Sequence, residues 1–325
     1  MKKFFFPLAC LLLLSTCAKK EAVVDITHES ETVVTKRTCA SDEVLQQEIK
    51  ENPARGRFLE ELENSTRNYT NRQKRSAGTL YVGVVVHVVL TNPALVTDAQ
   101  IQTQIDVLNK DFNAENKELA KPSVYLAGYD KNNVADCDLQ FYIAQIIRKQ
   151  TTVTAFSTNN GVKRSNQGGS DAVNAGTKLN IWVCNMSGGI LGYAQFPGGN
   201  SSTDGVVISY LSFGTRSTGY SLYDDYDMGR TTTHEVGHWF NLRHIWGDRT
   251  CGTDYVDDTP QHDTYNFGCP GEGHTSLCTG HPLEQWMNYM DYTDDACMYM
   301  FSHGQKLRMD AAIDNARAAW VSTTK

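Results

Sequence analysis

The residues whose types and spacing could carry chemistry lie in one stretch, from His234 to His244 (HEVGHWFNLRH). On a helix, residues four apart share a face, so the imidazoles of His234 and His238 can meet one metal ion. Glu235 lies beside them and can hold a metal-bound water. His244 reaches the same metal only if the helix breaks, and we predict the break at Asn241, because Asn tolerates positive φ well. Three imidazoles with an open fourth position are typical of a catalytic zinc.

A second segment, NYMDY at 288–292, lies downstream of the histidines. With the HExxH motif and the third histidine, it resembles the metzincin zinc peptidases and their methionine-containing turn. In that arrangement Met290 forms an apolar floor under the histidines. This chain has Asn241 where the family usually has glycine. The alternative interpretation is a surface helix that carries three unrelated histidines.

The resemblance implies hydrolysis of a peptide bond. A zinc ion bound by the histidines would lower the pKa of a water molecule, and Glu235 would accept the proton as the water attacks a carbonyl. Glu235 would then pass the proton to the leaving amine. Tyr292 is the candidate donor that stabilises the oxyanion together with the metal.

The composition is typical of a globular protein. Of the 325 residues, 40% are hydrophobic and 21% charged, which suits one large domain or two small ones. The net charge of −7, without a basic block typical of nucleic-acid binding, argues against a nucleic-acid partner.

The chain begins with features of an export signal. Two lysines precede an apolar run at 4–14 that is too short to span a bilayer. The following LSTC resembles a bacterial lipobox, which implies cleavage before Cys17 and a lipid anchor on its sulfur, with plain secretion as the alternative. We therefore expect an exported bacterial protein, either an outer-membrane lipoprotein or a secreted one.

Three parts of the chain are predicted. Residues 1–16 are expected to be the signal peptide, and residues 17–75 a tether and inhibitory pro-segment. A basic run at 72–75 is the expected processing site, with an ordinary linker as the alternative. Residues 76–325 form the expected catalytic domain, with an upper subdomain at 76–244 and a lower one at 245–325.

The apolar patterns predict an α/β (α+β) metzincin fold with a five-stranded, mixed, twisted sheet. The expected strands are 81–90, 139–147, 179–184, 188–196 and 205–210. The expected helices are a backing helix at 98–112, an active-site helix at 231–241, a C-terminal helix capped by Ser302, and two short N-terminal helices from Ser41 and from Asn52. His87 is interpreted as a core histidine. The segment 247–295 shows no regular pattern, so we expect a loop-rich lower part.

Six cysteines form an even set after Cys39: Cys137, Cys184, Cys251, Cys269, Cys278 and Cys297. In an exported chain such a set predicts disulfides, but six cysteines allow 15 pairings. Four of the six fall in or beside the loop-rich segment and can staple it.

Longer matches narrow the resemblance. HEVGHW, LRHIWGD, NYMDYTDD, LNIWVC at 179–184 and GYAQFP at 192–197 are similar to the pappalysin family, in its bacterial cytophagalysin (ulilysin-like) branch. The matches run from about Leu80 to Phe301. The resemblance implies that the strand with Gly189, Leu191 and Tyr193 forms the cleft rim and pairs with an extended substrate.

The resemblance also assigns Asp295, five residues after Met290, to the base of the pocket for the residue after the scissile bond. A buried carboxylate there would favour Arg or Lys. A solvated loop Asp or a calcium ligand is the alternative. Cys39, in the sequence RTCA, resembles the family's cysteine switch, in which a thiolate fills the open zinc position. Ala40 replaces the usual glycine, and an unpaired pro-segment thiol is the alternative.

Structural calcium is a further implication. Asp254, Asp257, Asp258 and the carbonyl of Thr259 are hard oxygen ligands on an irregular loop, as Ca²⁺ prefers. The alternative is an acidic, turn-rich loop. The family analogy also pairs Cys251 with Cys278 and Cys269 with Cys297, and leaves Cys137 and Cys184 undecided.

The sequence therefore predicts an exported zinc metalloendopeptidase made as a latent precursor, acting on proteins or peptides. One alternative is a surface lipoprotein that binds partners and keeps zinc only for structure. Glu235 beside three histidines argues against it, because a structural zinc needs a fourth protein ligand and no general base. A zinc hydrolase of non-peptide amides or esters is the other alternative.

Overall fold

The computed structural model describes residues 1, 34, 36–69, 78–120, 128–216 and 219–325. The expected signal peptide, Cys17 and the basic run at 72–75 lie outside the described residues. Within the described part, no helix combines the length and the apolar character that crossing a membrane requires.

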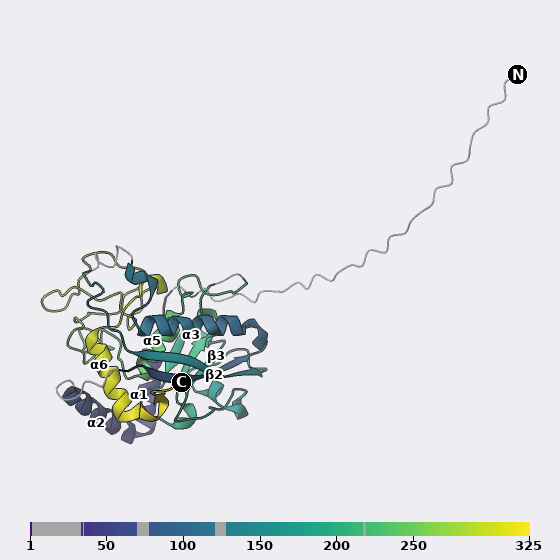
Figure 1. Cartoon of the computed structure of the whole chain (residues 1–325), viewed down its shortest axis with the longest axis horizontal. Helices are drawn as coiled ribbons and strands as arrows, with labels where there is room; N and C mark the ends of the chain where they lie inside the picture. Colours follow the sequence, from purple (N-terminus) through teal and green to yellow (C-terminus); the bar gives the residue numbers. More distant parts are fainter. Residues whose placement is uncertain (2–33, 35, 70–77, 121–127, 217–218) are drawn as a thin grey trace. The chain divides into compact units, whose positions relative to one another are not determined.

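A mixed sheet of six strands forms the centre of the fold (Figure 1). Its main path has the order β2-β1-β3-β5-β4, in which β4 runs antiparallel to β5 and the others are parallel. The strands are β1 (Leu80–Leu90), β2 (Leu139–Gln150), β3 (Leu179–Cys184), β4 (Gly192–Ala194), β5 (Val206–Ser209) and β6 (Val321–Ser322). The antiparallel β4 lies at the edge of this path, where its outer side can pair with a further extended segment.

Two details of the predicted sheet were wrong. The sheet has a sixth strand, because Val321–Ser322 pairs antiparallel with Tyr81 and Val82. Two residues are too few to give an alternating pattern in the sequence. The expected strand at 188–196 is shorter, because Gly188 and Gly189 have φ of 73° and form a turn before β4.

Strand β1 is buried on both faces, as its unbroken apolar sequence predicts. Val84 and Val86 face one core, which also contains side chains of the two helices α3 (Asp98–Phe112) and α5 (Arg230–Trp239). Val89 faces a second core on the opposite side. His87 is a core histidine, with Nδ1 2.9 Å from Ser170 Oγ and Nε2 2.8 Å from Asn180 Oδ1.

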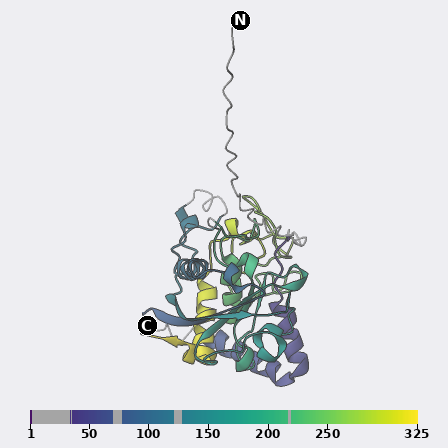
Figure 2. The same ribbon diagram turned by 90° about the vertical axis from the view of Figure 1, so that its right-hand side faces the viewer.

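The helices lie where the apolar periodicity predicts them. Helices α3 and α5 contact each other on the same face of the sheet, and Figure 2 shows α3 nearly end-on above it. Thr97 caps α3, and Ser302 forms a capping box at the start of α6 (His303–Ala312). The N-terminal helices are α1 (Ser41–Glu51) and α2 (Pro53–Tyr69), of which α2 packs against α6.

The part of the chain between α5 and α6 contains little regular structure. Two disulfides staple it, Cys251–Cys278 and Cys269–Cys297, in the pairing that the family resemblance implies. Cys137 and Cys184 are free and buried. Covalent links replace the ladder hydrogen bonds that this long segment lacks, and so the lower wall of the site is held in place.

Candidate active site

Helix α5 ends where the metal-binding geometry requires a break. Asn241 has φ of 75°, the left-handed conformation that the sequence predicts. Leu242 N donates to Gly237 O (3.0 Å), which closes the helix and redirects the chain toward His244. The helix is anchored because Val236 and Trp239 are fully buried in the main core.

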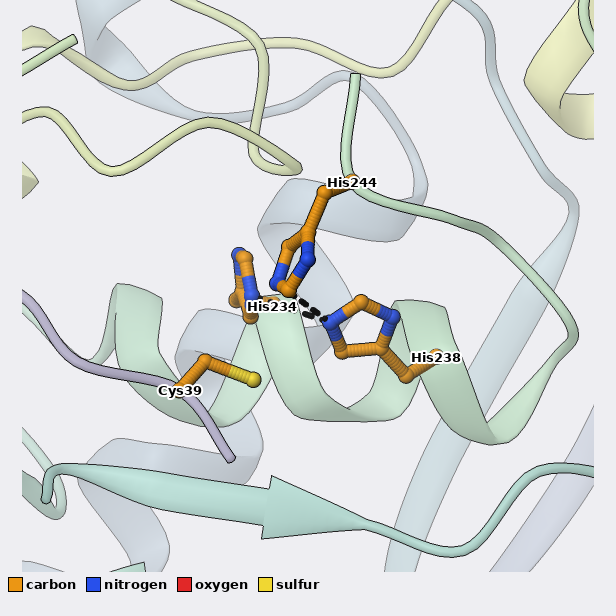
Figure 3. Close-up of side chains that lie close together, drawn as sticks. All are labelled: Cys39, His234, His238 and His244. Carbon is orange, nitrogen blue, oxygen red and sulfur yellow. Dashed lines mark hydrogen bonds between the residues drawn. The ribbon is translucent and has the colours of Figure 1, made fainter. Parts of the chain in front are cut away.

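Three imidazoles and one thiol point toward a common centre (Figure 3). The Nε2 atom of His238 lies 3.1 Å from Nε2 of His234 and 3.1 Å from Nε2 of His244. The possible ligand atoms of these residues and of Cys39 all lie within 4.8 Å of one another. All four side chains are buried.

The other ring nitrogens fix the orientation of the imidazoles. His234 Nδ1 donates to Tyr289 O (2.7 Å), His238 Nδ1 donates to Leu242 O (2.8 Å), and His244 Nδ1 pairs with Asp248 Oδ1. Each Nε2 therefore presents a lone pair to the centre, which is the ligand arrangement that zinc requires.

Burial reinforces this arrangement, because it lowers the pKa of His234 and His238 well below the usual value. Neutral imidazoles with converging lone pairs repel one another unless a cation lies between them. The chain's own donor set thus fits a tetrahedral metal with His234, His238 and His244 as ligands.

Asp248 was missed by the sequence analysis. It lies four residues after His244, and its carboxylate selects the tautomer of that imidazole. The spacing of four residues between His244 and Asp248 was the sequence signal that could have identified this contact. Trp246 stacks on the His244 ring with centroids 4.3 Å apart, which holds the ring from its other side.

Met290 lies directly beneath the active-site helix and is fully buried. A Cβ atom on Gly237 would stand 2.6 Å from Met290 Sδ, so only glycine allows this close approach. The turn around Met290 also supplies the Tyr289 carbonyl that holds His234. The turn around Met290 therefore both packs below the histidines and orients the His234 ring.

Glu235 faces the same cleft and is 1% exposed. Burial raises the pKa of its carboxyl to about 7. Ser41 Oγ donates to Glu235 Oε2 (2.7 Å), and Cys39 Sγ lies 3.5 Å from the same oxygen. The segment before α1 thus contacts the Glu235 carboxylate and also places Cys39 beside the three histidines.

The segment at 38–41 runs parallel to the edge strand β4. Leu191 N donates to Thr38 O (2.9 Å), and Ala40 N donates to Gly192 O (3.1 Å). Ala194 N donates to Ser41 Oγ (2.8 Å). Strand β4 therefore acts as the cleft rim toward the chain's own N-terminal segment.

The pairing differs in detail from the expectation. Gly189 lies in the turn before β4, and the Tyr193 side chain is buried in the second core, where its hydroxyl donates to Asn160 Oδ1. The backbone contacts with the N-terminal segment come from Leu191, which was among the expected residues, and from Gly192 and Ala194. Pairing of this strand with a substrate stays a prediction. Gly192 was missed. A Cβ atom there would stand 2.9 Å from Glu235 Cγ, so a side chain at this position would displace the catalytic carboxylate.

Tyr292 lies over the His244 ring at a centroid distance of 5.0 Å. Its hydroxyl donates to Cys39 O (3.2 Å), a carbonyl of the segment that fills the cleft. The hydroxyl therefore already binds a main-chain carbonyl beside the metal centre, which is the geometry that an oxyanion donor needs.

The buried side chain of Asp295 forms an ion pair with Arg37. Arg37 Nη2 lies 2.5 Å from Asp295 Oδ1, and both side chains are almost fully buried. Arg37 also donates to Thr231 Oγ1 and to Thr293 O (both 3.2 Å), and its guanidinium lies over the Tyr226 ring. The ion pair of Arg37 with Asp295 and the contacts of Arg37 with Thr231 and Tyr226 were not predicted from the sequence.

The expected calcium ligands are engaged within the chain. Asp254 accepts from Thr259 Oγ1 (2.9 Å) and from Val256 N (3.2 Å). Asp258 accepts from Ser302 Oγ (2.6 Å) and Gly304 N (2.8 Å), so it supports the start of α6. Among the described residues, the only cluster of His, Cys, Asp and Glu suited to a metal is the histidine centre. Calcium stays a prediction.

Known proteins are similar to this chain in sequence. The family model described as pregnancy-associated plasma protein-A matches residues 166–314. An extracellular metalloprotease of Pyricularia oryzae is 31% identical over 260 residues, covering 77% of this chain and 80% of that protein. Another, from Neurospora crassa, is 33% identical over 253 residues, with 74% and 77% covered.

Solved structures are also similar. A mutant of Tannerella forsythia promirolysin is 39% identical with a TM-score of 0.76, covering 87% of this chain and 95% of that one. Mature mirolysin with a cleaved peptide is 42% identical with a TM-score of 0.68, covering 75% and 95%. The fold and these relatives define a metalloendopeptidase. The chain belongs to the pappalysin family of metzincins.

Proposed function

We propose that this chain is the latent precursor of an exported zinc metalloendopeptidase that cleaves peptide bonds before Arg or Lys. The observation that carries the specificity is the buried contact between Arg37 and Asp295. A guanidinium already fills the pocket, and its charge is matched by a carboxylate at 2.5 Å. A substrate Arg or Lys can take the same place once the pro-segment has left.

The proposed roles follow from the geometry. His234, His238 and His244 hold the zinc, which when bound supplies a Lewis acid for the carbonyl and lowers the pKa of water. Glu235 accepts the proton of the attacking water and delivers it to the leaving amine.

Substrate alignment rests on two further features. The backbone of Leu191, Gly192 and Ala194 offers hydrogen bonds to an extended peptide without reading its sequence. The Tyr292 hydroxyl, which now binds the Cys39 carbonyl, would move to the carbonyl under attack and stabilise its negative charge.

Latency is proposed to come from the N-terminal segment within 17–75. Cys39 Sγ would fill the fourth ligand position of the zinc. Ser41 binds the Glu235 carboxylate, and Arg37 binds the Asp295 carboxylate. The promirolysin relative, named as a pro-form, supports this assignment. Processing near 72–75 would release residues 76–325 as the mature enzyme.

Two finer features belong to the proposal. The expected lipid anchor at Cys17 would tether the precursor to the outer membrane, and relatives named extracellular metalloproteases support export. Calcium is proposed at Asp254, Asp257 and Thr259, because burial raises the pKa of Asp254 to about 7 and a cation would offset that cost. Asp258 is less available, since it binds the start of α6.

The test compares the full-length precursor with its Glu235→Ala variant after limited proteolysis. Each protein is incubated with a diverse peptide mixture, with and without a zinc chelator, and all new termini are read by mass spectrometry. New N-termini that start with Arg or Lys, lost with the chelator and in the variant, are expected. Cleavage with another preference would remove Asp295 from the pocket. A fully zinc-loaded, processed protein that cuts nothing would contradict the peptidase assignment and favour a binding lipoprotein or a hydrolase of non-peptide substrates.

A further inference from the structure

The N-terminal segment gives the direction of the cleft. Arg37 lies at Asp295, Cys39 lies at the histidines, and Ser41 binds Ala194 at the end of β4. The chain then enters α1 and α2, which cover the surface beyond Ala194. If Asp295 receives the residue after the scissile bond, as proposed above, the residues before that bond must lie on this covered surface.

Arg243 and Arg308 lie on this covered surface. The guanidinium carbon of Arg243 lies over the Phe196 ring, 4.9 Å from the ring centroid. Phe196 follows the end of β4 by two residues. The Nε atom of Arg243 is buried without a hydrogen-bond partner, and no ion pair of Arg243 is present among the described residues. Arg243 is thus a guanidinium that lacks a carboxylate partner.

Acidic side chains of the pro-segment lie near these arginines. Glu63 of α2 binds Arg308 through both carboxylate oxygens, at 3.0 and 2.7 Å. Asp42 of α1 lines a cavity of about 330 Å³ together with Arg243 and Arg249. Figure 1 shows α2 beside α6, which carries Arg308.

Removal of the pro-segment would take these carboxylates away. Asp248, the remaining acidic residue at this cavity, is engaged by the His244 ring. Arg243 and Arg249 would then line the cavity without Asp42, and Arg308 would lose Glu63. Unpaired, partly buried guanidinium groups bind carboxylates through charge-assisted hydrogen bonds.

We propose that Arg243, with Arg249 and Arg308 beside it, forms a subsite for an acidic side chain located two to four residues before the scissile bond. The mature enzyme would therefore select substrates that carry Asp or Glu upstream and Arg or Lys directly after the cut. The pro-segment would hold the same subsite with Asp42 while the precursor is latent. This inference rests on the proposed function, because it uses the same cleft and direction.

The test uses the full-length precursor activated by limited proteolysis, with the released segment removed. Peptide pairs share one Arg after the scissile bond and differ only by Asp or Asn, placed in turn at each of the four upstream positions. We expect kcat/KM to be about fivefold higher for Asp than for Asn at one or two of these positions. The ratio should fall as salt is added, because the subsite is solvent-accessible once open.

Arg243→Gln should bring the Asp-to-Asn ratio close to one, while Arg243→Lys should retain part of it. Arg148→Gln is the matched control. Arg148 lies on the outer strand β2 and pairs with Asp98, so this variant should keep the wild-type ratio. A merely structural Arg243 would alter stability without moving this ratio.

The outcomes separate the two proposals. Equal rates for Asp and Asn at every position, with cleavage still before Arg, would overturn the acidic subsite and leave the peptidase assignment intact. A ratio that survives in Arg243→Gln would also overturn it. No cleavage of any peptide by the zinc-loaded, processed chain would overturn both. If Arg243→Gln fails to fold, the salt dependence and the Arg243→Lys ratio decide the question.

Discussion

Arg37 and Asp295 are separated by 258 positions in the chain, yet they form a buried ion pair at 2.5 Å. Asp295 also accepts hydrogen bonds from the backbone of Met228 and Arg230, which fix its second oxygen at the start of α5. The carboxylate is thus held by the start of α5, and in the proposed function Arg37 is the partner that a substrate side chain replaces. This asymmetry is what a pocket for a cationic side chain requires.

The first prediction concerns this exchangeable partner. Arg37→Gln should raise the activity of the unprocessed precursor on an Arg-containing peptide at least about tenfold, because breaking a buried charge pair costs about 3 kcal/mol. The measurement is cleavage of a fluorogenic peptide by precursor whose intact length is verified by mass spectrometry. Arg57→Gln is the control, since Arg57 is exposed on α2, and it should stay latent. Equal latency in both variants would argue against Arg37 as a lock.

The second prediction concerns the thiol. In the precursor loaded with Co²⁺ instead of zinc, the Cys39 thiolate should give a sulfur-to-metal charge-transfer band, and Cys39→Ala should abolish it. The same variant should show activity without processing, because the fourth position opens to water. Cys184→Ala should keep the band and the latency, since Cys184 is buried in the second core. A band that persists in Cys39→Ala would exclude Cys39 as a ligand.

Local sequence was enough to predict the metal centre. The spacing of His234 and His238 requires only helical geometry, and the turn at Asn241 requires only a residue that tolerates positive φ. The cap at Thr97 and the capping box at Ser302 are likewise local. Such features depend on a few neighbouring residues and so are visible in the sequence.

The partners that come from distant segments were not visible. The Arg37–Asp295 pair depends on how the N-terminal segment lies in the cleft, which no periodicity records. Gly192 matters because Glu235 approaches it, and a glycine gives no hint of its neighbour. The two-residue β6 is recognised only through its partner β1. Tertiary contacts, not propensity, decide these features.

The third prediction concerns Tyr292. Tyr292→Phe in the processed enzyme should lower kcat about 10- to 100-fold with a smaller change in KM, because the hydroxyl acts on charge that develops in the transition state. Tyr265→Phe is the matched control, because the Tyr265 ring stacks on Tyr292 with centroids 5.4 Å apart. The kcat of this variant should stay within about twofold of the wild-type value. Steady-state kinetics on one Arg-containing peptide measures both. Equal kcat for Tyr292→Phe and the wild type would remove Tyr292 from catalysis.

The last prediction concerns stability and Lys163. This lysine is 2% exposed, its Nζ donates to Thr203 O (2.7 Å), and burial lowers its pKa to about 8 from 10.5 in the unfolded chain. Between these values the unfolded chain binds more protons, so this lysine makes the free energy of unfolding rise with pH. The expected gain is about 2 kcal/mol from pH 7.5 to 9.5.

Urea unfolding of the full-length precursor at the two pH values measures that gain. Lys163→Met removes the titrating group, so the variant should show a rise smaller than the wild type by about 2 kcal/mol, whatever its absolute stability. Lys149→Met is the control, because Lys149 is exposed on β2, and it should follow the wild type. If the free energy of unfolding rises equally with pH in Lys163→Met and in the wild type, the lysine keeps its ordinary pKa in the fold. The rings of Trp182 and Tyr193, with centroids 5.3 and 4.9 Å from Nζ, would then stabilise its charge.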